Sequence, residues 1–309
     1  MMTRRTFLRH SSALASTAAA SPAPAADPVR VLDAHVHFYD PTRPQGVPWP
    51  SNNQPVLYRP TYSERYLSNI QPFRVDGVVA VEASPWLEDN LWLLEVADRS
   101  RLVRAVVGNI PPGRAEFKNE LGRFARHPLF RGIRINAGFV PAILAQPEAQ
   151  ADLKLLAAKD LSLDILLDSP RRFAEIARLA TMLPDLRLVL GHLPLDPPRD
   201  AAGKAASRDD LRALGRLPSV HAKVSGVVRR IAGQVPADAA FYKPALDELW
   251  ETFGPGRVIY ASNWQASDLT APYPVVYRIV RDYLADKEPQ TIDRYFSKNA
   301  STVYQCNLA

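Results

Sequence analysis

The sequence predicts a (β/α)8 barrel, the TIM-barrel fold, in a single domain, and three observations support this fold. Short runs rich in Val, Ile and Leu alternate with longer amphipathic segments from about residue 30 to the end of the chain. Eight such runs can be counted, which is the number of strands that a barrel needs. No glycine-rich phosphate loop follows the first run, which disfavours the alternative fold, an open doubly wound sheet.

The expected strands cover residues 30–37, 77–83, 102–110, 130–136, 161–167, 186–192, 220–226 and 257–262. Helices are expected between them, among others at residues 90–100, 115–127, 171–183, 242–253 and 274–287. Apolar residues recur in these segments at intervals of three and four, as in a helix that packs on a sheet. The proline-rich loop 38–62 after the first strand is expected to form a stiff flap over the mouth of the barrel.

The first 25 residues are typical of an export signal. Residues 1–25 combine a basic start, an apolar run of alanine and serine, and an Ala-Pro-Ala cleavage site. The stretch TRRTFLR, residues 3–9, resembles the twin-arginine motif. We therefore expect the twin-arginine export machinery as a partner, a mature domain at residues 26–309, and a periplasmic location.

The composition is that of an ordinary globular protein, with 47% hydrophobic and 23% charged residues among 309. Removing residues 1–25 takes away three arginines and lowers the formal net charge from +6 to +3. The rest of the chain has no run of Lys and Arg and no aromatic stacking series, so we expect no nucleic-acid partner. A lone cysteine, Cys306, rules out an internal disulfide and a Cys-based zinc cluster.

Polar residues collect where the expected strands end, which is where barrel enzymes place their chemistry. They are His35, His37, Glu82, Asn109, Arg134, Asn136, Asp168, His192, Lys223, Ser225 and Asn263. His35 and His37 alternate on a strand and point to the same side. Such a pair suits a divalent metal, with zinc the expected ion, but it also occurs as a hydrogen-bonded pair without metal. The spacing leaves both readings open, and Asp33 could orient one histidine.

The chain resembles the amidohydrolase superfamily, in particular its branch of barrel lactonases that includes 2-pyrone-4,6-dicarboxylate lactonase and the fucono- and rhamnono-lactonases. The match begins with LDAHVHFYDP at residues 32–41. Further matches follow in order, one per strand, up to NASTVY at residues 299–304. They include GVVAVEASP, FRGIRIN, LDILLDS, LVLGHL, VHAKVSGV and RVIYASNWQ.

The resemblance implies roles for individual residues. His35 and His37 match a pair that binds a divalent metal in many relatives, although some lactonases of this branch work without one. His192 matches a histidine that polarises the substrate carbonyl or binds metal. Arg134 and Lys223 fall where substrate carboxylates or hydroxyls are held. A small-molecule substrate is therefore expected, namely a polyhydroxy or carboxylated lactone.

One departure concerns the water-activating base. Where the family usually has SDWP, this chain reads SNWQ, with Asn263 in place of an aspartate. An amide cannot accept a proton as a carboxylate does. The remaining candidates for the base are His192, Glu82 and Asp268, although Glu82 could instead pair with Arg134 and Asp268 could cap a helix.

Aromatic residues near the strand ends suit a sugar or cyclic ester. Trp264, Tyr39 and Trp49 are the candidates for contact with substrate, although each is individually as typical of packing.

Three functions remain open at the level of sequence. The first is a lactonase or related carboxylic ester hydrolase. The second is a lactone isomerase, in which a substrate hydroxyl replaces water and Asn263 need not act as a base. The third is a non-catalytic periplasmic binding barrel. Whether the chain forms a homo-oligomer is also left open.

Overall fold

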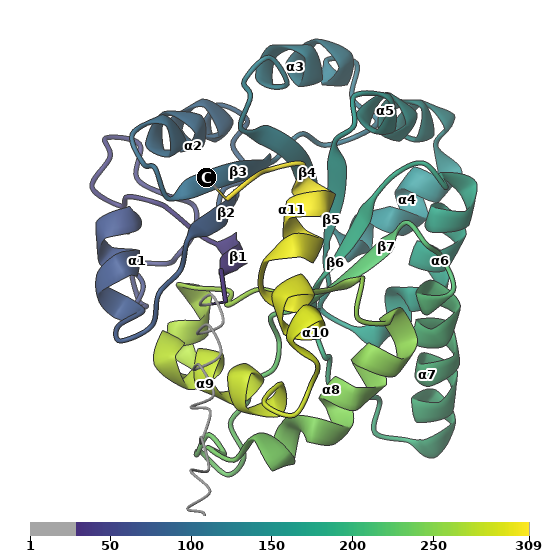
Figure 1. Ribbon diagram of the computed structural model, residues 1–309. Helices are drawn as coiled ribbons and strands as arrows, with labels where there is room; N and C mark the ends of the chain where they lie inside the picture. Colours follow the sequence, from purple (N-terminus) through teal and green to yellow (C-terminus); the bar gives the residue numbers. More distant parts are fainter. Residues whose placement is uncertain (1–28, 309) are drawn as a thin grey trace, which may run out of the picture.

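The computed structural model describes residues 29–308, and its centre is a ring of eight parallel strands in sequence order (Figure 1). A parallel bridge between Val36 and Trp264 joins the first strand to the segment after the last one. This bridge nearly closes the ring, so the barrel prediction is confirmed and the open sheet is excluded. The strands are β1 (Leu32–Val36), β2 (Gly77–Val81), β3 (Val103–Gly108), β4 (Phe130–Asn136), β5 (Ser162–Leu166), β6 (Leu188–Leu193), β7 (Val220–Val224) and β8 (Val258–Tyr260).

Helices surround the ring and cover its outer face (Figure 1). The strands are buried on both faces, which explains why they read as nearly continuous apolar runs. The helices are α1 (Ser63–Asn69), α2 (Asp89–Asp98), α3 (Phe117–Phe124), α4 (Val140–Ala145), α5 (Pro147–Ala158), α6 (Phe173–Met182), α7 (Ala201–Gly215), α8 (Ala239–Phe253), α9 (Tyr273–Tyr283), α10 (Pro289–Asp293) and α11 (Asn299–Tyr304). Short turns of other helix types are η1 (Ala137–Phe139), η2 (Pro170–Arg172), η3 (Ala266–Leu269) and η4 (Arg294–Lys298).

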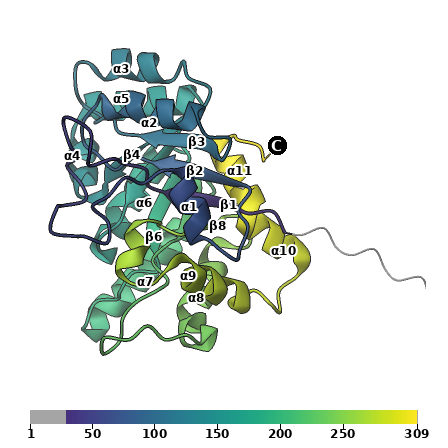
Figure 2. The ribbon, with the colours of Figure 1, turned by 90° about the vertical axis from the view of Figure 1, so that its left-hand side faces the viewer.

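Helix α11 covers the end of the barrel at which the strands begin. Ala300 and Val303 of α11 pack in one cluster with inward-facing residues such as Val79. Arg187, just before β6, donates from Nε to the Val303 carbonyl over 3.0 Å. Figure 2 shows α11 at one end of the molecule and the loop 38–62 at the other. A ligand site is therefore expected at the loop end.

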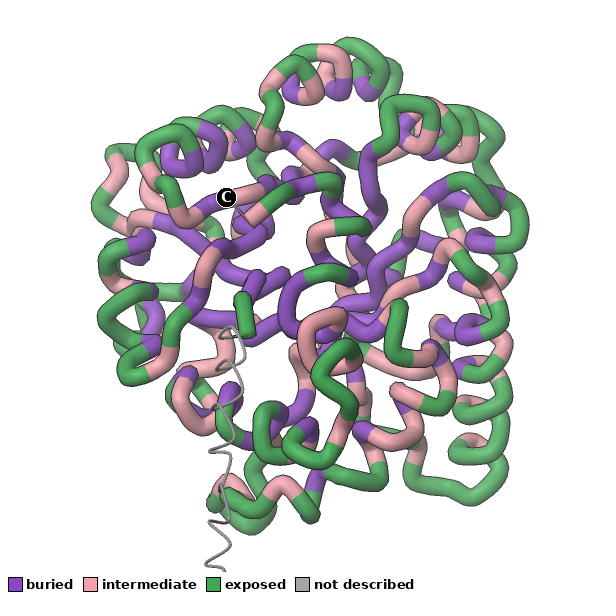
Figure 3. Tube along the Cα trace, in the orientation of Figure 1, coloured by how far each residue is buried: buried purple, intermediate pink, exposed green. Residues whose placement is uncertain are grey.

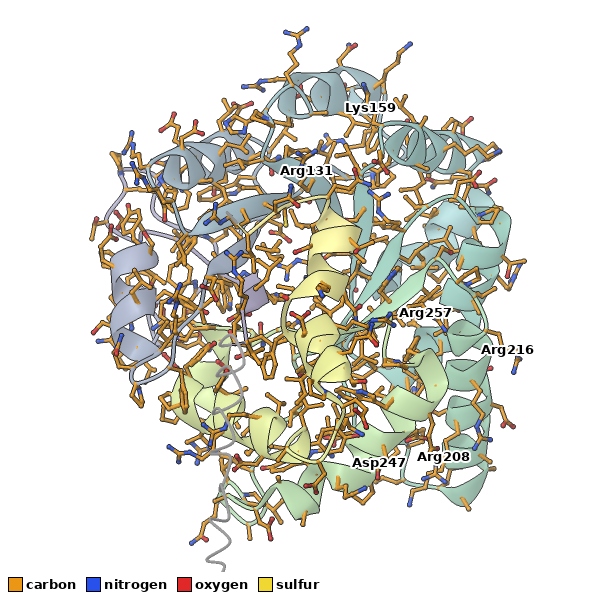
Figure 4. All side chains as sticks on the ribbon, in the orientation of Figure 1. Arg131, Lys159, Arg208, Arg216, Asp247 and Arg257 are labelled. Carbon is orange, nitrogen blue, oxygen red and sulfur yellow. The ribbon has the colours of Figure 1, made fainter. Side chains whose placement is uncertain are left out.

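Burial follows the layers of the fold. In Figure 3 the strands and the inner faces of the helices are buried, whereas the outer faces of the helices are exposed. Charged side chains lie on that outer surface, where Figure 4 labels Arg208 on α7 and Asp247 on α8. Arg208 pairs with Glu248 across these two helices at 3.2 Å, a half-exposed contact of small energetic weight. Within residues 29–308, no helix has the length and apolar character needed to cross a bilayer.

The predicted signal segment, residues 1–25, lies outside the described residues. Export through the twin-arginine route and a periplasmic location therefore stay predictions.

Candidate active site

A cavity of about 710 Å³ opens at the carboxyl ends of the strands, at the end of the barrel opposite α11. This volume is usual for a small-molecule site. Nine polar residues line it, and six of them come from six different strands or strand ends: His37, Glu82, Asn109, Arg134, His192 and Asn263. The other three are Ser84, Asn136 and Gln146. The structure thus brings together most of the strand-end residues selected from the sequence.

His35 and His37 form a buried, neutral pair. Their Nε2 atoms are 3.1 Å apart, and their rings meet edge to face. His37 Nδ1 lies 3.0 Å from the Val81 carbonyl oxygen, which only accepts, so the His37 proton sits on Nδ1. The His35 Nε2–H then donates to His37 Nε2. Burial lowers the pKa of both rings well below the usual value, helped by Lys223 for His35 and by Arg134 for His37.

His192 presents an N–H group to the cavity. Its backbone is left-handed, with φ of 66°, and its amide donates to Ser225 Oγ over 2.9 Å. The Ser225 hydroxyl proton remains free to donate to His192 Nδ1, 3.3 Å away. The ring proton is then on Nε2. Burial, followed by the charges of Arg134 and Lys223, lowers the pKa of His192 to about 3, so the ring stays neutral and acts as a donor.

Arg134 and Glu82 form the ion pair that was one of the two sequence interpretations of Glu82. Arg134 Nε donates to Glu82 Oε1 over 2.7 Å, and its Nη2 donates to the Glu82 carbonyl over 2.8 Å. The Ser84 amide holds Oε2 at 2.9 Å. Among the described residues, Arg134 is the only cation and Glu82 the only acid that lines the cavity. The Nη1 hydrogens of Arg134 are left for a ligand.

Asn263 lines the cavity and has an unpaired side-chain oxygen. Its φ of 57° is left-handed, a conformation that asparagine tolerates better than most residues. Its Oδ1 is buried without a hydrogen-bond partner. Asn263 and His192 also line a second cavity of about 170 Å³, whose wall includes Ser225 and Ser267, and Ser267 Oγ is likewise unpaired. Buried polar atoms facing such a space are normally satisfied by water.

Trp49 is the aromatic residue of the predicted set that lines the cavity. Its ring stands edge-on to His37 at 5.5 Å and to Tyr39 at 5.3 Å. Tyr39 does not line the cavity and supports the loop instead, since its hydroxyl donates to Gln265 Oε1 over 2.7 Å. Trp264 is fully buried against Tyr66 and also lies outside the lining.

Lys223 lies in the barrel interior, away from the cavity lining. It is fully buried, and its Nζ donates to Asp164 Oδ2 over 2.6 Å. The Tyr304 hydroxyl of α11 binds the same carboxylate at 2.9 Å and 3.1 Å. Burial lowers the pKa of Lys223, and Asp164 acts in the opposite direction. The geometry makes Lys223 half of a buried ion pair, and its side chain does not line the cavity.

Asp268, the third candidate base, sits in η3 and does not line the cavity. Burial raises its pKa, and the charge of Arg65 opposes that shift. Because Asp268 does not line the cavity, the structure does not bring it together with His192 and Glu82.

The sequence model of the amidohydrolase family matches residues 32–306. The chain belongs to this family. The resemblance drawn from the sequence is confirmed, and this amidohydrolase is an enzyme of the hydrolase class.

Two relatives are lactonases of the same name. An L-fucono-1,5-lactonase of Burkholderia ambifaria is 29% identical over 248 residues, which cover 78% of this chain and 82% of the relative. An L-fucono-1,5-lactonase of Burkholderia multivorans is 27% identical over 263 residues, which cover 81% and 86%. The amidohydrolase described here is thus similar to lactonases along most of its length.

Solved structures support the fold. A Burkholderia multivorans amidohydrolase with bound zinc has a TM-score of 0.79 and 23% identity, covering 90% of this chain and all of that one. A probable 2-pyrone-4,6-dicarboxylic acid hydrolase of Acinetobacter baumannii has a TM-score of 0.70 and 15% identity, covering 89% and 99%.

The donor set of this amidohydrolase does not fit a complete metal centre. The 3.1 Å between the two Nε2 atoms is close to the ~3.3 Å expected for two tetrahedral zinc ligands. However, a metal-bound histidine normally passes its other N–H to a partner, and His35 Nδ1 is buried without one. Within residues 29–308, no group of three His, Cys, Asp or Glu side chains is placed to hold an ion. The nearest carboxylate in the lining, Glu82, is engaged by Arg134.

Two parts of the site were missed from the sequence. Asp164 is an acidic residue in the middle of an apolar strand. That position could have predicted a buried ion pair from the sequence. Phe139 and Ile143, just after β4, also line the cavity. They gave no signal, because apolar residues there look the same as residues that pack a helix on the sheet.

Asp33 is expected to make stability depend on pH. This buried carboxylate accepts hydrogen bonds from the Ser262 amide and the Tyr66 hydroxyl, both at 2.8 Å, and its oxygen Oδ1 is 3.3 Å from the His35 amide rather than near the His35 ring. Burial nevertheless raises its pKa from 3.8 to about 6. The folded state therefore binds the proton more tightly than the unfolded state, and this stability is present at low pH and lost as the pH rises from about 4 to about 6.

The expected size is about 3 kcal/mol, from about two pKa units at 1.36 kcal/mol each. We expect the Asp33→Asn variant to lack this decline in the free energy of unfolding, which urea titrations at pH 4 to 7.5 would measure. Subtracting the two profiles removes the contribution of other groups. Parallel profiles for the two proteins would contradict the assignment.

Proposed function

We propose that this amidohydrolase hydrolyses the ester bond of a lactone. One observation carries the proposal: a neutral histidine donor, an arginine and a carboxylate, namely His192, Arg134 and Glu82, line the same cavity. These are an oxyanion-stabilising pair and a proton acceptor, the groups that ester hydrolysis requires. The similarity to L-fucono-1,5-lactonases supports the choice of a lactone.

The carbonyl oxygen of the substrate is polarised by two donors. His192 offers Nε2–H, and Arg134 offers its free Nη1 hydrogens. Neither group exchanges a proton during the reaction. The low pKa of the His192 ring makes it a poor proton acceptor, and a neutral imidazole N–H and a guanidinium are both very weak acids. As water attacks, the negative charge that develops on the carbonyl oxygen is stabilised in a largely buried setting.

The attacking water is held and deprotonated by two further groups. Asn263 Oδ1 accepts a hydrogen bond from the water and orients it, and the small polar cavity behind Asn263 supplies replacement water. Glu82 accepts the water proton as the new C–O bond forms. It then returns that proton to the ring oxygen as the ester C–O bond breaks, so the product is a hydroxy acid and the enzyme is restored.

A panel of lactones tests the proposal. The full mature chain is incubated with five- and six-membered lactones, and acid release is followed by pH-stat titration with product analysis by NMR. Hydroxy acid formed at a rate proportional to enzyme supports hydrolysis. A rearranged lactone without acid would identify an isomerase, and unchanged substrate across the panel would overturn the proposal.

Activity is expected to survive removal of divalent metals. The two histidines are hydrogen-bonded to each other, and the steps above use none but protein groups and water. We expect kcat to change less than twofold after dialysis against a chelator, with residual zinc measured by elemental analysis. A zinc hydrolase treated in parallel serves as the control. Loss of activity that returns on adding zinc would contradict this expectation.

A further inference from the structure

The cavity has a polar floor and an apolar wall. The floor carries His37, His192 and Arg134, whereas the wall is built from residues that follow β3 and β4 and from the last residue of β5. These wall residues are Pro111, Pro112, Phe139, Ala142, Ile143 and Leu166. A ligand whose carbonyl lies at the floor therefore directs its other end toward apolar side chains.

Phe139 is an aromatic side chain held open to solvent at this wall. It is 62% exposed, the largest exposure among the large apolar side chains of residues 29–308. The turn η1 that carries it is fixed, because Asn136 Oδ1 accepts from the Gly138 amide over 2.7 Å. The next residue, Val140, is fully buried in the core. Phe139 is thus a positioned apolar surface that a ligand can cover.

Two of the polar groups near the wall are already engaged. The Asn136 side-chain oxygen caps η1, and Ser84 Oγ accepts from the Trp86 amide over 3.1 Å. The side chains of Asn109 and Gln146 also line the cavity and can bind a hydroxyl. A sugar hydroxyl placed instead on Phe139, Ala142 or Ile143 would leave hydrogen bonds unmade. The charge of Arg134 is balanced by Glu82, and no other lysine or arginine of the described chain lines the cavity. A carboxylate substituent on the lactone would therefore lack a cationic partner.

We infer that the substrate is a lactone with an apolar alkyl or aryl substituent, which packs on Phe139, Ala142 and Ile143 while the carbonyl meets His192 and Arg134. This inference rests on the proposed lactone hydrolysis. It differs from the polyhydroxy or carboxylated lactone implied by the sequence resemblance.

Matched substrates test the inference. δ-Lactones with alkyl chains of increasing length and one phenyl-substituted δ-lactone are compared with glucono-1,5-lactone and 2-pyrone-4,6-dicarboxylate. We expect kcat/KM to rise about fourfold for each methylene group buried against the wall. The hydroxylated and dicarboxylated substrates are expected to fall below every alkyl lactone. Equal or higher kcat/KM for them would overturn the inference and leave the proposed function standing.

A variant pair assigns the effect to the wall. Phe139→Ala is expected to reduce the kcat/KM ratio between the longest and the shortest alkyl lactone at least fivefold. Phe241→Ala is the control, because Phe241 on α8 is also a half-exposed phenylalanine, at 48%, but does not line the cavity. An equal change of the ratio in both variants would overturn the inference.

Binding of lactams separates the two proposals, because a δ-lactam has the shape of the lactone and resists hydrolysis. Tighter binding of alkyl lactams than of polyhydroxy lactams, by calorimetry, supports the apolar wall even if no lactone in the panel is cleaved. No cleavage and no such preference would overturn both proposals.

Discussion

Replacing Glu82 by glutamine is expected to lower kcat for lactone hydrolysis by about 10²- to 10⁴-fold, the usual contribution of a general base. Glutamine has nearly the same shape, and its amide oxygen still accepts from Arg134 Nε. The proton acceptor is lost, however, since an amide does not bind a proton in this range. Steady-state kinetics on the best lactone of the panel would measure kcat and KM separately, with a fall mainly in kcat expected.

A matched control is Glu88→Gln. Glu88 also pairs with an arginine, Arg123, through two contacts of 2.7 Å, but it lies on the surface away from the cavity. We expect this variant to retain the kcat of the natural chain. A Glu82→Gln enzyme that keeps more than a tenth of that kcat while folding normally would remove Glu82 from the mechanism and turn attention to the His35–His37 pair.

Replacing Lys223 by methionine is expected to cost about 3–5 kcal/mol of unfolding free energy. The change leaves Asp164 as a buried carboxylate whose remaining partners are the Tyr304 hydroxyl and, at 3.5 Å, the Ser162 hydroxyl. A charge in the barrel interior that loses its counter-ion is destabilising, whatever the pair itself contributes. Urea unfolding followed by circular dichroism at pH 7 would measure the loss.

The double variant Lys223→Met with Asp164→Leu is expected to recover most of that stability, because the buried charge is then absent. Lys204→Met, on the exposed side of α7, is the surface control, with an expected change within about 0.5 kcal/mol. A loss below about 1 kcal/mol for Lys223→Met alone would show that the pair carries little of the barrel's stability.

The strand pattern made the fold predictable, because eight apolar runs in parallel strands buried on both faces leave a strong signal. The same pattern placed Glu82, Arg134, His192 and Asn263 at strand ends, and the structure brings them to one cavity. The position of a residue within its strand determines at which end of the barrel the residue lies. It does not fix how a side chain is engaged there.

The remaining features depend on contacts across the barrel. Lys223 pairs with Asp164, 59 residues earlier in the chain, and does not line the cavity. Trp264 turns against Tyr66 of α1 instead of into the cavity. The left-handed backbone of His192 decides where its ring points, and neither its neighbours nor its spacing reveals that conformation in advance.

The contact that closes the barrel also holds residues of the cavity in place. The first and last strands meet where the His37 amide donates to the Trp264 carbonyl over 2.7 Å, between one cavity residue and the neighbour of another, Asn263. Any opening of this seam separates His37 from Asn263 before the helices need to unfold. Hydrogen exchange at the His37 amide would therefore report, through a single proton, how often the enzyme is disassembled at its reacting centre while the rest of the molecule stays folded.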